Sequence, residues 1–236
     1  MEKAKRISSK KTLTSAGTDR IYFGSEFCER LLPSVAKLKR ILKEVRRLEN
    51  KFSLLTPPST EIGVKHIRAL AACLNEEDEI VVNDYGILRM VDGISRNPVV
   101  IGRVLGRNFL HALKALGRDD HAVNEHISLL GSRIKGIEVD YFNAASVSSF
   151  LSERIGFFLY TGAVFWTTTR RCAFNKASKP LNKFAMCQRQ CLVNEAILEN
   201  KVAHKKFLLH GNAIFNMNDA AFSKPDYKIF KRIVSP

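Results

Sequence analysis

The stretch RIYFGSEFCERLLPSVAKLKRILKEVRRLENK, residues 20–51, contains the pattern that decides the fold. Its first five residues are rich in β-forming side chains and end in glycine, which predicts a short strand. Residues 33–51 then repeat apolar side chains at helical spacing, which predicts an amphipathic helix; they are Leu38, Ile41, Leu42, Val45 and Leu48. A strand followed directly by a helix is typical of a parallel sheet with helical crossovers.

Short apolar strands recur along the rest of the chain. We expect seven more, at residues 52–56, 79–83, 99–102, 136–140, 156–160, 206–212 and 228–234, mostly separated by helical segments. Eight parallel strands of this kind predict a closed (β/α)8 TIM-type barrel in the α/β class. We expect a compact barrel that lacks the last helix, because the chain ends at Pro236, directly after the last expected strand.

The composition favours one soluble globular domain. The chain has 236 residues, of which 45% are hydrophobic and 26% charged, and single barrels reach this length. Residues 1–20 are basic and rich in Ser and Thr, which predicts a disordered tail, so we expect a single barrel domain over residues 21–236. No apolar run approaches the roughly 20 residues of a membrane span and no secretory signal is visible, so we expect a cytoplasmic protein.

The net charge of +15 is the strongest feature of the composition. Such an excess attracts polyanions, and RNA is the partner that it suggests. A basic surface that is simply solvated would have the same composition, so both interpretations stay open at this point.

Four of the five cysteines follow expected strands. Cys28 comes after the first strand, and Cys172, Cys187 and Cys191 come after the sixth. The active sites of TIM barrels lie at the C-terminal ends of the strands, so all four cysteines are expected on one face. Four thiolates could hold an iron–sulfur cluster or zinc, and unliganded buried cysteines are the plain alternative. Cys73, in an expected helix, is interpreted as a small buried hydrophobic residue.

Polar side chains at the same ends of the strands are candidates for substrate binding. Arg103 and Arg171 stand out, because a forked guanidinium suits a carboxylate or a phosphate. Asp140 is a weaker candidate. Any of these residues could instead satisfy local hydrogen bonds of a loop. The full set is Glu26, Asn83, Asp84, Arg103, Glu138, Arg171 and Asn212.

Several segments resemble the collagenase-like U32 peptidase family. They are RIYFGSEFC at 20–28, EIVVNDYGILRMV at 79–91, NPVVIGRVLGRN at 97–108, TTTRRCAF at 167–174, the pair Cys187 and Cys191, FLLHGNAIF at 207–215 and RIVSP at 232–236. The resemblance is greatest to the short, single-barrel members of the UbiU/UbiV type. It implies a [4Fe-4S] cluster that is bound by Cys28, Cys172, Cys187 and Cys191, the same residues that the strand order selects.

The resemblance also implies a function. It suggests oxygen-independent hydroxylation of a quinone precursor in ubiquinone biosynthesis, or of RNA, with a homologous barrel protein as heteromeric partner. A peptidase, as the family name says, is the second hypothesis, although the chain has no HExxH or GxSxG motif. A non-catalytic RNA-binding or scaffold protein is the third.

Overall fold

The chain folds into two compact units in the computed structural model. The structure describes residues 1–9, 13, 17–116, 125, 133–140, 155–169, 172–174, 187, 189–201, 205–217 and 227–236. The first unit comprises Met1–Gly162 and Lys224–Pro236, and the second comprises Ala163–Ser223. No described helix is long and apolar enough to cross a membrane.

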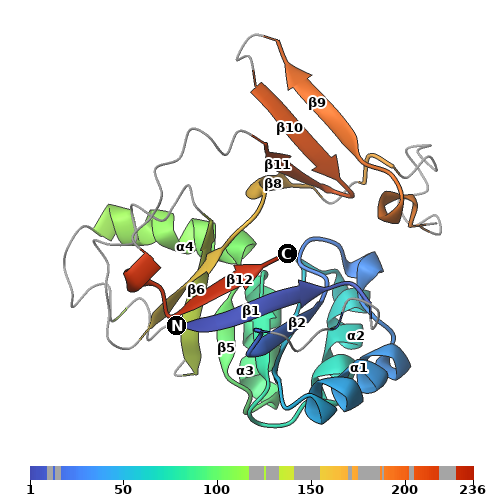
Figure 1. Ribbon diagram of the computed structural model, residues 1–236, viewed down its shortest axis with the longest axis vertical. Helices are drawn as coiled ribbons and strands as arrows, with labels where there is room; N and C mark the ends of the chain where they lie inside the picture. The colour runs from blue at the N-terminus through green and yellow to red at the C-terminus, as the bar shows by residue number, and fades with distance from the viewer. Residues whose placement is uncertain are drawn as a thin grey trace. The chain divides into compact units, whose positions relative to one another are not determined.

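The first unit is a closed barrel of eight parallel strands (Figure 1). The order around the barrel is β1-β12-β7-β6-β5-β4-β3-β2, and every neighbouring pair is parallel. The prediction of a TIM-type barrel is therefore confirmed. The strands are β1 (Glu2–Ile7), β2 (Arg20–Gly24), β3 (Lys51–Leu55), β4 (Glu79–Val82), β5 (Val99–Ile101), β6 (Ile134–Asp140), β7 (Gly156–Tyr160) and β12 (Arg232–Ser235).

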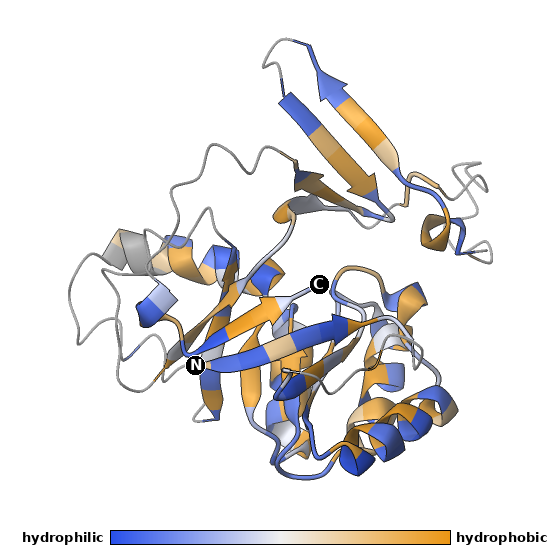
Figure 2. Ribbon diagram, viewed as in Figure 1, coloured by the Kyte–Doolittle hydropathy of each residue, from blue (hydrophilic) through white to orange (hydrophobic). Residues whose placement is uncertain are grey.

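Four described α-helices follow strands of the barrel: α1 (Val35–Arg47), α2 (Glu61–Ala71), α3 (Tyr85–Ile94) and α4 (Arg103–Leu116). Side chains fix where two of them begin, because Ser34 accepts a hydrogen bond from the Lys37 amide and Asp84 accepts from the Gly86 and Ile87 amides. The helix α1 has one apolar face and one polar face, so apolar and polar residues alternate in groups along its sequence (Figure 2). The apolar face belongs to the core outside the barrel strands. The segment between β6 and β7, residues 141–154, lies outside the described residues.

One barrel strand differs from expectation. Strand β1 lies within the segment that was predicted to be a disordered tail, and it pairs with both β2 and β12. Two of its charged side chains have partners inside the barrel: Glu2 pairs with Arg20 and Arg232, and Arg6 pairs with Glu26. Two of the three inward positions of β1, Glu2 and Arg6, are ionic, so the segment shows little apolar pattern and its composition was misleading.

The second unit corrects the expectation of one domain over residues 21–236. It is a four-stranded antiparallel sheet in the order β8-β11-β10-β9. Aromatic pairs pack within it, with the ring centroids of Trp166 and Phe207 5.8 Å apart and those of Phe165 and Phe215 6.3 Å apart. The strand expected at 206–212 is β10 and therefore belongs to this sheet instead of the barrel. The strands are β8 (Val164–Thr168), β9 (Ala196–Asn200), β10 (Lys205–His210) and β11 (Ala213–Asn216).

Candidate functional site at the C-terminal ends of the barrel strands

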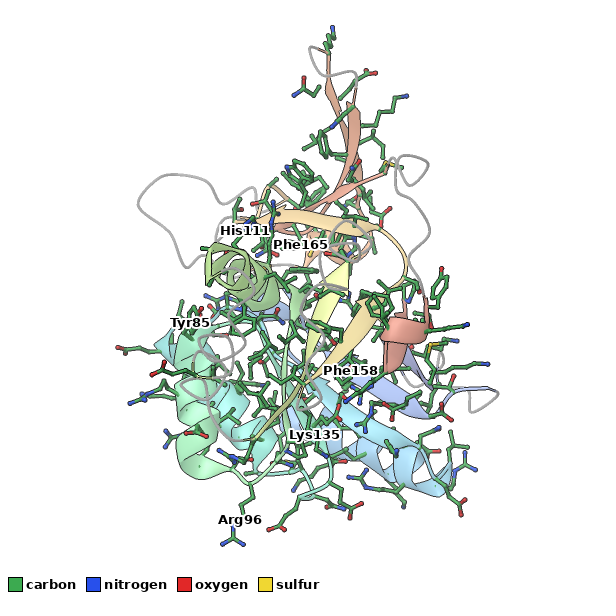
Figure 3. All side chains as sticks on the ribbon, turned by 90° about the vertical axis from the view of Figure 1, so that its left-hand side faces the viewer. Tyr85, Arg96, His111, Lys135, Phe158 and Phe165 are labelled. Carbon is green, nitrogen blue, oxygen red and sulfur yellow. The ribbon has the colours of Figure 1, made fainter. Side chains whose placement is uncertain are left out.

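The interior of the barrel combines an apolar layer with buried ions. Successive residues of a strand point to opposite faces, so in β6 the outward Ile137 and Val139 join the core outside the strands, while Glu138 lies on the inward face. The inward apolar layer is a separate cluster that includes Tyr22, Phe158 and Tyr160 from β2 and β7; its other members are Ala4, Leu55, Val81, Val100 and Val234. Figure 3 shows Phe158 among the barrel strands, whereas Arg96 projects away from them.

Arg103 is the centre of the charged group at the C-terminal ends of the strands. It is the first residue of α4 and is buried. Its guanidinium donates from Nε to Glu26 Oε1 at 2.7 Å, from Nη2 to Glu26 Oε2 at 2.8 Å and from Nη1 to Asp140 Oδ1 at 2.8 Å. The Tyr160 ring lies against it, with its centroid 3.8 Å from the guanidinium carbon. We call Arg6, Glu26, Arg103 and Asp140 the Arg103 cluster.

The electrostatics of the Arg103 cluster keep the guanidinium charged. Burial acts to lower the pKa of Arg103, and the carboxylates of Glu26 and Asp140 more than offset it, so the pKa lies well above its ordinary value. Arg6 adds a second cation, with Nη1 3.4 Å from Glu26 Oε2. The cluster is therefore neutral overall, and the Arg103 guanidinium is already bound by two carboxylates.

The loop after β2 positions both Glu26 and Cys28. Gly24 has φ +138°, and a Cβ at this position would lie 2.3 Å from the Leu55 carbonyl oxygen, so only glycine fits. Ser25 then donates its amide to the same oxygen at 3.2 Å, and its hydroxyl donates to the Cys28 carbonyl at 2.7 Å. This turn buries the Glu26 carboxylate completely and leaves Cys28 half-buried.

Two further candidates make structural hydrogen bonds here. Asn83 donates from Nδ2 to the Thr56 carbonyl at 3.0 Å and accepts from the Val104 amide at 2.9 Å. It thus connects the ends of β3 and β4 to the start of α4. Asp84 is the N-cap of α3. The alternative that these residues satisfy local hydrogen bonds of a loop therefore accounts for the observed contacts of both.

Glu138 has a different environment. Its side chain is buried, and neither carboxyl oxygen has a hydrogen-bond partner. Burial is the main cause that raises its pKa to about 8; the Glu26 carboxylate acts in the same direction, whereas Arg103, Arg232 and the Tyr22 hydroxyl act to lower it. The Tyr160 hydroxyl is also buried without a partner, and burial raises its pKa. These are the two unsatisfied groups on the inward face of β6 and β7 in the described part of the chain.

A second charged group occupies the N-terminal ends of the strands. Arg232 donates from Nη1 and Nη2 to Glu79 at 2.7 and 2.9 Å, and from Nη1 to the Tyr22 hydroxyl at 2.7 Å. Arg20 and Glu2 complete it, with Arg20 Nη1 3.3 Å from Glu79 Oε2. Sequence reasoning missed this group, together with Arg6 and Tyr160. The available signal was the occurrence of charged residues at alternate positions within predicted apolar strands, such as Glu79 and Glu138.

The remaining candidates belong to the second unit. Asn212, in the turn between β10 and β11, donates from Nδ2 to the carbonyl of Thr169, the residue after β8, at 2.7 Å. Cys191 is buried, and a Cβ at Gly211 would lie 3.7 Å from its Sγ. Cys172 and Cys187 are half-buried, and the Arg189 amide lies 3.4 Å from Cys187 Sγ. Arg171 lies outside the described residues.

The cysteines are divided between the two units. Cys28 belongs to the barrel, and Cys172, Cys187 and Cys191 belong to the second unit. Over the described residues, no three His, Cys, Asp or Glu side chains are grouped as ligands of one metal ion. The four-cysteine site therefore stays a prediction. Cys73 follows α2, packs against the core and donates from Sγ to the Ala69 carbonyl at 3.5 Å.

Comparison with known proteins supports the fold. A solved structure of the U32 peptidase Mk0906 aligns with all of this chain and with 92% of its own chain, with a TM-score of 0.54 and 10% sequence identity. The fold resembles that of a U32 peptidase. No protein-family model and no curated protein matches the sequence. At this identity the likeness establishes the architecture and leaves the chemistry to be argued from the residues.

Proposed function

We propose that this U32-peptidase-like protein binds a [4Fe-4S] cluster through Cys28, Cys172, Cys187 and Cys191. We further propose that it takes part in oxygen-independent hydroxylation of a quinone precursor or RNA, in complex with a homologous barrel protein. The observation that carries the proposal is the position of Cys28, which follows β2 in the same short turn as Glu26. Reacting groups of TIM barrels lie at these ends of the strands.

The donor chemistry fits the cluster, because thiolates are its usual ligands. Within the described residues these thiols are not grouped as ligands of one metal ion, so the proposal rests on their chemistry and on their order along the chain. A bound cluster would supply one-electron chemistry that side chains cannot. The barrel would contribute the Arg103 cluster and Glu138.

The Arg103 cluster also limits the kind of substrate group that can bind at this end of the barrel. An anionic substrate group would have to displace Glu26 or Asp140 from Arg103, since both carboxylates are bound at 2.7 to 2.8 Å. Removing one partner of a buried charge pair is strongly unfavourable. The geometry therefore favours a neutral substrate group at this end of the barrel over a carboxylate or phosphate.

Anaerobic purification with iron and sulfide analysis tests the proposal. We expect about four irons per wild-type chain, as a four-cysteine cubane requires. The Cys187→Ser variant is expected to lose iron and visible absorption together, whereas the matched Cys73→Ser variant keeps both. A wild-type protein without iron, or equal loss in the two variants, would contradict the cluster. Zinc in place of iron would exclude the redox role.

The two alternatives have different tests. A peptidase is suggested by the name of the Mk0906 structure, and its activity would survive complete removal of iron. RNA binding is favoured by the outer face of α1, where Lys39, Arg40 and Lys43 are exposed. Phosphate contacts release counterions, so RNA affinity would fall steeply with salt, and the fall would be smaller when these three residues are changed to Gln.

A further inference from the structure

Among the described residues inside the barrel, Glu138 is the carboxyl that has no ion pair. The Arg103 cluster contains two arginines and two carboxylates. The group at the other end also contains two of each, Arg20, Arg232, Glu2 and Glu79, with the exposed Lys51 3.6 Å from Glu2. Glu138 lies on the inward face of β6 and makes no ion pair in the described part of the chain.

The carboxyl of Glu138 is also isolated in its hydrogen bonding. Both oxygens are buried and have no partner within hydrogen-bond distance, and the Tyr22 hydroxyl is a donor whose interaction acts to lower the pKa of Glu138. The adjacent strand β7 offers Tyr160, whose hydroxyl has no partner either. Neither group is exposed at the surface of the protein. An ionised carboxylate without a counterion or a hydrogen-bonded donor is unfavourable in a protein interior, and a proton removes that cost.

Burial is the largest influence that favours the neutral form of Glu138, and its charged and titratable neighbours act in both directions, with the Tyr22 hydroxyl among those that favour ionisation. The Glu26 carboxylate, after β2, opposes ionisation of Glu138. Arg103 at the start of α4 and Arg232 on β12 favour ionisation, but their charges are already matched by Glu26, Asp140, Glu79 and Glu2. Tyr22 on β2 and Tyr160 on β7 are neutral, because burial raises the pKa of each phenol.

We propose that Glu138 is an internal proton-binding site of the barrel, neutral in the free protein, that holds an exchangeable proton beside the Arg103 cluster. The proton would be released to a group of higher basicity, or when a cationic group enters this end of the barrel. The carboxyl would then become an anion with a counterion nearby. The inference goes beyond the proposed function and does not depend on the cysteines.

Infrared spectroscopy detects the proton directly, because the carbonyl stretch of a carboxylic acid differs from that of a carboxylate. We expect a carboxylic-acid band in the wild-type protein at neutral pH that disappears as the pH rises through about 8. Glu138→Gln should lack this band. The matched variant Glu77→Gln, at an exposed glutamate, should retain it. Absence of the band from the wild type, or its persistence in Glu138→Gln, would overturn the proposal.

The pH dependence of unfolding is a second readout. The folded pKa of about 8 exceeds the ordinary value of 4.5, so the folded protein binds the extra proton between these values. The unfolding equilibrium constant should then rise by up to tenfold per pH unit across that window, and Glu138→Gln should remove this rise. A Gln variant that fails to fold would also contradict the proposal, because the amide mimics the neutral acid. The carboxylic-acid band does not depend on iron content. A failure of the cluster hypothesis can therefore be distinguished from a failure of the proposal for Glu138.

Discussion

The Arg103 guanidinium binds Glu26 through two parallel hydrogen bonds, of 2.7 Å from Nε and 2.8 Å from Nη2. The pair joins the turn after β2 to the first residue of α4, which lies 77 positions later in the chain. Both side chains are buried, so the pair is shielded from salt and water. This contact therefore holds together two segments that carry the candidate site.

Loss of the Arg103 side chain should destabilise the barrel strongly. In Arg103→Met the carboxylates of Glu26 and Asp140 remain buried without their cation, and we expect the free energy of unfolding to fall by about 3–5 kcal/mol. Urea denaturation measures it. The double variant Arg103→Met/Glu26→Gln removes a charge of each sign and should be less destabilised than the sum of the single variants. A loss below about 1 kcal/mol in Arg103→Met would be inconsistent with a buried ion pair.

Gly24 should tolerate no side chain. Gly24→Ala would place a Cβ 2.3 Å from the Leu55 carbonyl oxygen at φ +138°, so we expect a loss of at least about 1–3 kcal/mol, the usual cost of such backbone strain. Gly93→Ala is the matched control, because nothing lies within 4 Å of a Cβ at that helical position. It should stabilise α3 by about 0.5–1 kcal/mol. Thermal or urea unfolding of both variants measures the difference, and similar stabilities would refute this account.

Glu2 should contribute to stability in a pH-dependent way. Burial acts to raise its pKa, but Arg232 and Arg20 outweigh burial, so the pKa lies below the ordinary 4.5. A lowered pKa in the folded state gives stability that is present above 4.5 and is lost as the pH falls through the folded value. We expect Glu2→Gln to be less stable than wild type at pH 7 and to lose less stability on acidification. Urea titrations at pH 7 and pH 3 provide the comparison; parallel losses would be evidence against the ion pairs.

We expect Asn83 to stabilise the protein by connecting β3 and β4 to α4. Asn83→Ala leaves the Thr56 carbonyl and the Val104 amide without their buried partner, and unsatisfied groups of this kind cost about 1–3 kcal/mol each. The exposed Asn194, which donates to the Gln190 carbonyl at 2.9 Å, is the control. Its replacement by Ala should change stability by less than about 0.5 kcal/mol. Equal effects in equilibrium unfolding would show that burial of Asn83 is unimportant.

The architecture was predictable from the sequence because most barrel strands are short, apolar and followed by helices. Seven of the eight expected strands are in the barrel. The eighth expected segment is β10, whose apolar residues Phe207, Leu208 and Leu209 are equally suitable for an antiparallel sheet. Periodicity reports which residues form a strand and does not report its sheet.

The candidate site was predictable in part. Position at or just after the C-terminal end of a strand selected Glu26, Arg103 and Glu138, which the fold brings into one charged interior. Arg6 was missed because its segment contains few apolar residues, and its partner Glu26 lies 20 positions away. Ion pairs between distant strands depend on barrel closure, so no local pattern reveals them. The relation of the four cysteines also depends on more than strand order, since it involves both units.

The pairing of β1 with β12 has a consequence for how the chain folds. Glu2 and Arg232, partners in this pair, are 230 positions apart, so the ring of strands can be completed only after the chain has been synthesised as far as β12. Until then β1 and β7 both present open edges, which are liable to pair with other chains. The second unit is inserted between β7 and β12 and delays this closure further. We therefore expect the pairing of β12 with β1 and β7 to limit the rate of folding, because contacts of long sequence separation form slowly.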